Sequence, residues 1–221
     1  MITRNYLAFV LLFFIAACAN LAGIEKATLD TEGVQASGGG ASLGGSGGMA
    51  TGGTASGGAL NAVEAKRLAC ETFCTDVQTT CTGANQVYTS EEVCRSVCSN
   101  FDLGRPLDET GNTVTCRINN VRQAKQNGEV QIHCPAAGPG GNGICGADCE
   151  NYCGLMAAIC PDIFASRVAC GAECLKLTTQ NTYNTSIIKG NDVQCRLYHV
   201  SAATTNTMLH CPHAGGAVPC Q

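Results

Sequence analysis

Cysteine spacing constrains the fold of this chain more than any other feature. The chain has 221 residues and 17 cysteines, and sixteen of the cysteines follow residue 61. Such a density is typical of a scaffold held by disulfide bonds. The sixteen form two sets of eight, at 70, 74, 81, 94, 98, 116, 134 and 145 and at 149, 153, 160, 170, 174, 195, 211 and 220. Corresponding members are 75 to 79 residues apart, which predicts a tandem repeat.

Other residues repeat with the cysteines. Val114-Thr115-Cys116-Arg117-Ile118 corresponds to Val193-Gln194-Cys195-Arg196-Leu197, and His133-Cys134-Pro135 corresponds to His210-Cys211-Pro212. We therefore predict two eight-cysteine modules, residues 63–146 and residues 147–221, called copy one and copy two below.

The spacing of the cysteines and apolar residues predicts helices. Cysteines four residues apart share one helix face, so we expect a first helix over about 65–81. The sequence from Thr89 to Glu92 matches a capping box that would open a second helix. Val114, Ile118 and Val121 follow the i, i+4, i+7 pattern of a third helix. The predicted fold is all-α, with about three short helices and a looped tail in each copy.

The paired Cys-x₃-Cys helices resemble α-hairpinin peptides and the small mitochondrial carrier chaperones. In those families two antiparallel helices are joined by an outer and an inner disulfide. The resemblance implies the pairs Cys70–Cys98, Cys74–Cys94, Cys149–Cys174 and Cys153–Cys170.

The other eight cysteines have no such guide, and eight cysteines in one copy allow 105 connectivities. We predict pairs that join the third helix to the first, Cys81–Cys116 and Cys160–Cys195. The tails would then close on themselves through Cys134–Cys145 and Cys211–Cys220. Zinc-bound thiolates are the alternative for the cysteines of both copies, because the Cys-x₃-Cys spacing suits zinc ligands, but thiols oxidise outside the cytoplasm.

The amino terminus predicts export. Residues 1–17 carry one positive charge followed by an apolar run too short to span a bilayer, as in a secretory signal peptide. Ile15-Ala16-Ala17-Cys18 resembles the lipobox of bacterial lipoproteins, in which the cysteine is acylated with fatty acids such as palmitate. The resemblance implies lipidation at Cys18, and Ala19 in place of aspartate favours the outer membrane. The alternative is an ordinary signal peptide with an incidental cysteine.

Residues 18–62 then form a linker between the lipid and the modules. The segment Ser37–Gly58 has 11 glycines in 22 residues. It has too few apolar side chains to offset the entropy lost on folding, so we predict disorder. The whole layout resembles cysteine-rich surface lipoproteins of myxobacterial type, whose repeats end in a Cys-Arg-x-Tyr-His and His-Cys-Pro-His-Ala block. Copy two has this block from Cys195 to Ala214, whereas copy one departs from it at Asn119, Asn120 and Ala136.

Three histidines of copy two are the candidate metal ligands: His199, His210 and His213. Imidazoles close in sequence, with a third brought near by a disulfide, could bind Cu²⁺ or Zn²⁺. The alternative is structural, because copy one keeps His210 as His133. We predict no cofactor and no catalytic residue.

Three hypotheses about function follow. The first is a non-enzymatic, lipid-anchored protein at the bacterial surface or in the periplasm, with the membrane and an unidentified protein or surface component as partners. The second is a metal-binding or redox accessory lipoprotein that uses the three histidines. The third, an enzyme or enzyme inhibitor, has only the disulfide scaffold in its favour. Thirteen Lys and Arg against 17 Asp and Glu, a net charge of −4, give no basic stripe for nucleic acid.

Overall fold

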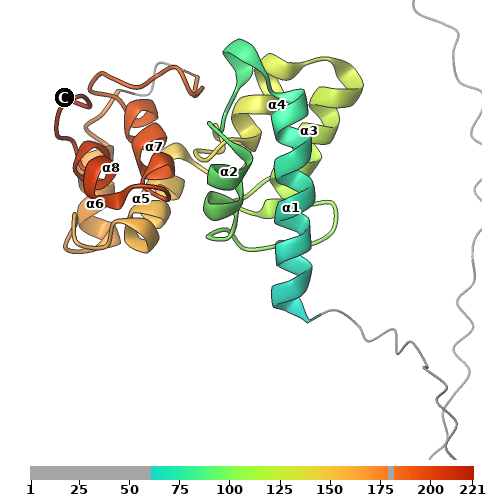
Figure 1. The fold of residues 1–221 in the computed structure, drawn as a ribbon, viewed down its shortest axis with the longest axis horizontal. Coiled ribbons are helices and arrows are strands. Elements are labelled where there is room, and N and C mark those ends of the chain that lie inside the picture. The colour runs from blue at the N-terminus through green and yellow to red at the C-terminus, as the bar shows by residue number, and fades with distance from the viewer. Residues whose placement is uncertain (1–60, 179–181) are drawn as a thin grey trace, which may run out of the picture. The chain divides into compact units, whose positions relative to one another are not determined.

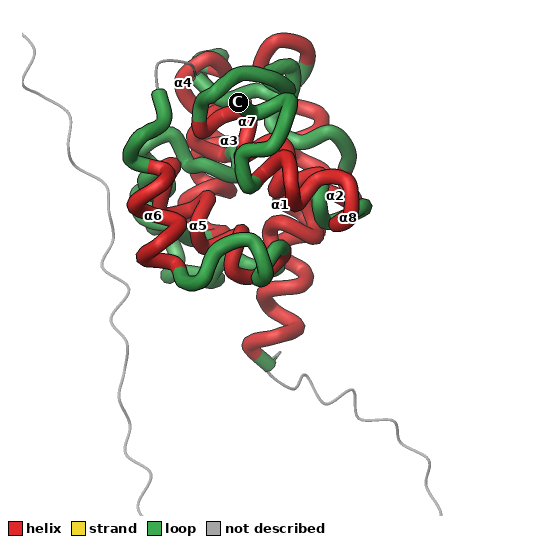
Figure 2. The backbone as a smooth tube through the Cα atoms, turned by 90° about the vertical axis from the view of Figure 1, so that its left-hand side faces the viewer, coloured by secondary structure: helices red, strands yellow, loops and turns green. Residues whose placement is uncertain are grey.

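Helices make up the regular structure of this protein. The computed structural model describes residues 61–178 and 182–221. The predicted signal peptide, Cys18 and all but the last two residues of the predicted linker lie outside these ranges. The described part has no strand, only two isolated bridges, so the all-α prediction is confirmed (Figure 2). The helices are α1 (Ala62–Thr80), α2 (Glu91–Cys98), α3 (Val114–Asn127), α4 (Val130–Ala137), α5 (Asp148–Ile159), α6 (Arg167–Cys174), α7 (Val193–Ala202) and α8 (Thr207–Ala214).

The two copies each gather four of these helices (Figure 1). Helices α1 to α4 belong to copy one and α5 to α8 to copy two. The copies also touch each other, since the Thr185 backbone N–H donates to the Gln86 carbonyl at 2.8 Å. The described residues therefore form one compact unit rather than two separate domains.

Side-chain caps fix where the helices begin, and several caps recur at equivalent positions. Thr113 of copy one and Asp192 of copy two each accept a hydrogen bond from the backbone N–H three residues later. Helix α2 begins differently from the prediction. Ser90, not Thr89, is its N-cap and accepts from the Val93 N–H at 3.1 Å.

The predicted looped tails contain a fourth helix in each copy, α4 and α8. Both helices have eight residues and carry a proline, Pro135 or Pro212, which removes one backbone hydrogen bond. Helices this short are marginal by themselves, so their formation depends on tertiary contacts that a local sequence pattern does not report. Helix α4 packs on α1 and α3, and α8 packs on α5 and α7.

All sixteen cysteines of the described residues form disulfides, and every bond stays within its own copy. The structure holds the four pairs that the α-hairpinin resemblance implied, which join α1 to α2 and α5 to α6: Cys70–Cys98, Cys74–Cys94, Cys149–Cys174 and Cys153–Cys170.

The other four predicted pairs, 81–116, 134–145, 160–195 and 211–220, are wrong. The physical reason is the fourth helix: packed on the first and third helices, it places its cysteine beside the end of the first. The last cysteine of each copy is then left for the third helix. The observed bonds are Cys81–Cys134, Cys116–Cys145, Cys160–Cys211 and Cys195–Cys220.

Each copy contains an edge-to-face pair of one phenylalanine and one tyrosine. The tyrosine is the second residue of the pair in copy one and the first in copy two. Copy one pairs Phe73 of α1 with Tyr88, and copy two pairs Tyr152 of α5 with Phe164 at the equivalent positions. Tyr88 donates to the Ala137 carbonyl at 3.1 Å, and Tyr152 donates to the Ala214 carbonyl at 2.7 Å. These two carbonyls are also equivalent. Each copy thus satisfies the end of its fourth helix with a phenol from a different element.

A buried cation completes this end of copy one. Arg117 is fully buried, and its guanidinium lies 3.5 Å from the centre of the Phe101 ring. It donates to the carbonyl of Gly138 at 3.2 Å, just beyond α4, and to that of Thr113 at 3.0 Å. Burial lowers the pKa of Arg117 to about 10, so the side chain stays charged at neutral pH. A cation at this helix end is favourable.

Free-thiol counts distinguish the observed pairing from the predicted one. Removing Cys81 and Cys134 together, as Cys81→Ser/Cys134→Ser, should add no free thiol to the exported chain, because the two form one bond. The matched variant Cys81→Ser/Cys116→Ser should expose two, at Cys134 and Cys145. Alkylation of the denatured, unreduced protein followed by mass measurement counts them. The reverse result would restore the 81–116 pairing.

The aromatic pair predicts a rescue by exchange of the hydroxyl. Tyr88→Phe should lower the free energy of unfolding by about 1–3 kcal/mol, because the buried Ala137 carbonyl loses its donor. Adding Phe73→Tyr copies the arrangement of copy two and should recover most of the loss. Denaturant unfolding measures both. If the double variant is no more stable than the single one, the two copies do not use interchangeable donors.

Candidate functional site

The candidate site lies between α7 and α8 of copy two. Helix α7 carries His199, and α8 carries His210 and His213 three residues apart, on one helix face. Asn206 caps α8 by accepting from the Leu209 N–H. The disulfides Cys195–Cys220 and Cys160–Cys211 fix the two helices to the rest of copy two.

The structure brings the three predicted histidines together. His199 Nδ1 lies 3.0 Å from His210 Nδ1. The ring of His213 is 4.8 Å from that of His199 and 6.1 Å from that of His210, centre to centre. One nitrogen from each ring can be chosen so that all three lie within 4.8 Å of one another. His199 is buried, whereas His210 and His213 are partly exposed, so solvent reaches the cluster.

A backbone carbonyl orients His199. Its Nε2 lies 3.2 Å from the Ile188 oxygen, which can only accept a hydrogen bond. The proton of a neutral His199 is therefore on Nε2, and Nδ1 offers a lone pair toward His210. The hydrogen in the contact between the two Nδ1 atoms then belongs to His210.

Burial keeps these rings neutral. Loss of solvent lowers the pKa of His199 and of His210, and the neighbouring imidazole of His213 lowers both further. The neutral ring is the form that coordinates a metal ion. His213 adds an unusual feature: its Nδ1 is buried and has no hydrogen-bond partner. A buried polar atom without a partner costs free energy.

Copy one shows what the same positions do without the two additional histidines. Asn120 stands at the position of His199, and Ala136 stands at that of His213. The Asn120 oxygen lies 2.9 Å from Nδ1 of His133, the counterpart of His210. The Asn120 amide also donates to the Cys116 carbonyl at 3.0 Å. In copy one the histidine that both copies share, His133, thus has a hydrogen-bond partner that ties α3 to α4.

The sequence identified Asn120 only as a departure from the block of copy two, and it did not identify the Ile188 carbonyl. The alignment of Asn120 with His199 was a usable signal, because the two side chains sit at one position of the repeat. Nothing in the sequence marks a backbone carbonyl. Cys195 and Cys220 also lie close to His199. They offer no thiolate to a metal ion, because their two sulfur atoms are bonded to each other.

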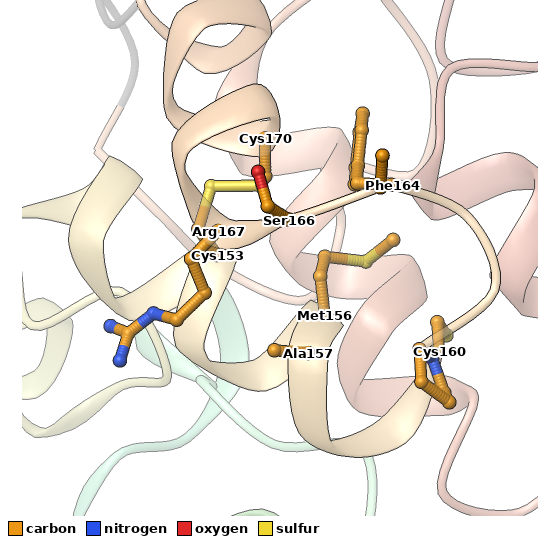
Figure 3. A pocket seen from close by; sticks show the side chains of 10 residues that line it. Cys153, Met156, Ala157, Cys160, Phe164, Ser166, Arg167 and Cys170 are labelled. Carbon is orange, nitrogen blue, oxygen red and sulfur yellow. A yellow bond between two sulfur atoms is a disulfide. The ribbon is translucent and has the colours of Figure 1, made fainter.

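A small pocket lies elsewhere in copy two, between the end of α5 and the start of α6 (Figure 3). Its volume is about 160 Å³, below the range of about 300–1,000 Å³ usual for small-molecule sites. Met156 and Phe164 line it, and the Cys153–Cys170 disulfide forms one wall. The Arg167 side chain extends away from Phe164, so no group of polar atoms converges there (Figure 3).

One known domain family matches part of this chain. Residues 51–148 match the BfoA family C-terminal domain. The matched region contains all eight cysteines of copy one and ends before the first cysteine of copy two. Copy one is therefore similar to this cysteine-rich domain. No curated protein and no solved structure matches the chain.

The number and placement of the disulfides indicate an extracellular or periplasmic location. A small helical domain held in this way suits a structural or binding role. Among the described residues, no helix combines the length and the apolar character needed to cross a bilayer.

The shared histidine predicts a stability effect in copy one. His133→Ala should lower the free energy of unfolding by about 1–3 kcal/mol, because the buried Asn120 oxygen loses its partner. Glu129→Gln is the matched control: this exposed side chain lies 3.6 Å from the other nitrogen of His133 and should contribute less than about 1 kcal/mol. Equal effects of the two variants in denaturant unfolding would contradict the structural role of the Asn120 contact.

Proposed function

We propose that this protein is a lipid-anchored, non-enzymatic protein of the bacterial surface or periplasm whose two disulfide-bonded copies have a binding or structural role. Acyl chains on Cys18 would hold the protein at the membrane, with the outer membrane favoured by Ala19. The glycine-rich segment would separate the folded copies from the lipid headgroups.

Cysteine pairing is the observation that carries this proposal. The eight disulfides use all sixteen cysteines after residue 61, and none joins the two copies. The seventeenth cysteine, Cys18, has no partner among them and stands at the end of an export signal. An unpaired thiol is unusual in an exported protein, whereas acylation would account for it.

The surface of copy two supports a binding role. Three of its apolar side chains are more than 80% exposed: Val168 and Leu175 at the ends of α6, and Met208 in α8. The equivalent residues of copy one are polar, namely Glu92, Ser99 and Gln131. Exposed apolar side chains gain free energy when a partner covers them. Copy two therefore offers contacts that copy one lacks.

The anchor predicts a change of location. Wild-type protein should sediment with membranes and partition into detergent, because two or more acyl chains give stable anchoring. Cys18→Ser should remain at the precursor mass or appear in the soluble fraction. Cell fractionation, detergent partitioning and intact-protein mass measure the difference.

The matched control for this experiment is Ser46→Ala, a change in the linker that leaves the cysteine in place. It should behave as the wild type. Wild-type protein without added lipid mass, or membrane association that persists in Cys18→Ser at the mature mass, would overturn the lipid anchor.

A further inference from the structure

We propose that His199, His210 and His213 form a binding site for one divalent transition-metal ion, with Cu²⁺ bound more tightly than Zn²⁺. Imidazole nitrogen suits both ions, and copper is the stronger binder at a given set of nitrogen ligands. The site does not depend on the lipid anchor and goes beyond the binding or structural role proposed above.

Geometry is the first support for this site. Metal–nitrogen bonds of about 2.0–2.1 Å place tetrahedral ligand nitrogens about 3.4 Å apart. The nitrogens of the three rings now lie within 4.8 Å of one another, with His199 and His210 at 3.0 Å. Small side-chain rotations would therefore bring all three to bonding distance of one ion. The partial exposure of His210 and His213 leaves a path for the ion and room for a water molecule as fourth ligand.

The surroundings of the rings are the second support. A metal-binding histidine usually donates its other N–H to a carbonyl or carboxylate, which orients the ring. His199 has this arrangement through the Ile188 carbonyl, and its Nδ1 faces the cluster at 3.0 Å from His210 Nδ1. His213 has a buried Nδ1 without a partner. Coordination requires a nitrogen lone pair: the one on His199 Nδ1 accepts only from His210, which an ion bound between the two rings would displace, and His213 Nδ1 has no hydrogen-bond partner.

Copy one provides the third support, because it shows that the fold does not need the additional histidines. Its third and fourth helices form with the equivalent disulfides and with Asn120 and Ala136 in these places. Asn120 takes the place of His199 as the partner of the shared histidine there. The presence of His199 and His213 in copy two therefore exceeds what packing of the two helices requires, and a ligand accounts for the excess.

The test is a calorimetric titration of the full exported chain in detergent with Cu²⁺ and with Zn²⁺. We expect one saturable site per chain at micromolar concentration or below, with Cu²⁺ the tighter ion. The double variant His199→Asn/His213→Ala places the residues of copy one in copy two. Changes near a metal ligand alone cost about 10–100-fold in affinity, so losing two ligands should weaken binding by more than about 100-fold.

Two controls keep the outcome unambiguous. His133→Ala removes the histidine of copy one and should leave the affinity unchanged. His213→Ala alone changes only a partly exposed residue and should also weaken binding, which covers the case in which the double variant fails to form its disulfides. For Cu²⁺, electron paramagnetic resonance should show coupling to imidazole nitrogen, with one coupled nitrogen fewer in His213→Ala than in the wild type.

Absence of saturable binding of both ions to the wild-type chain would overturn the proposal. Binding that is unchanged in His213→Ala and in the double variant would overturn it as well, because the ion would then sit elsewhere.

Discussion

The disulfide between the first and fourth helices of each copy is the constraint on which the rest of the structure depends. Cys81–Cys134 and Cys160–Cys211 close the longest loops in the two copies, with sequence separations of 53 and 51 residues. Closing loops of this length is worth about 4 kcal/mol in the chain-entropy picture. The eight-residue α4 and α8 would not persist without such support, and the phenol contacts and the histidine cluster all involve these two helices.

The two copies can be compared position by position, because they are repeats of one sequence pattern. The two copies have the same four disulfides and the same helix order, so differences between them separate what the fold requires from what it allows. The aromatic pair shows allowed variation: the hydroxyl of Tyr88 or of Tyr152 reaches an equivalent carbonyl from a different element. The histidines differ in number. The ring that both copies share, His133 or His210, contacts the third helix in each copy, and copy two has two further histidines.

This comparison links the scaffold to its proposed chemistry. Residues that satisfy buried backbone groups recur or exchange between copies, as the phenols do. His199 and His213 do neither: copy one has Asn120 and Ala136 at the equivalent positions, and the two histidines leave one buried nitrogen without a partner. Oxidised cysteines leave imidazole as the ligand type present at this cluster. A rigid, disulfide-held frame suits such a site, because ligands held in place lose little freedom when an ion binds.

The sequence by itself determined the repeat, the all-α fold and the identity of the three candidate ligands, and its resemblance to the α-hairpinins implied the four disulfides between Cys-x₃-Cys helices. These depend on short-range spacing: cysteines four residues apart lie on one helix face whatever surrounds them. Tertiary structure alone decided the partners of Cys81, Cys116, Cys160 and Cys195, because these depend on where the fourth helix packs. It also decided that the Ile188 carbonyl orients His199 beside His210. Contacts of this kind join atoms whose distance in the sequence carries no signal.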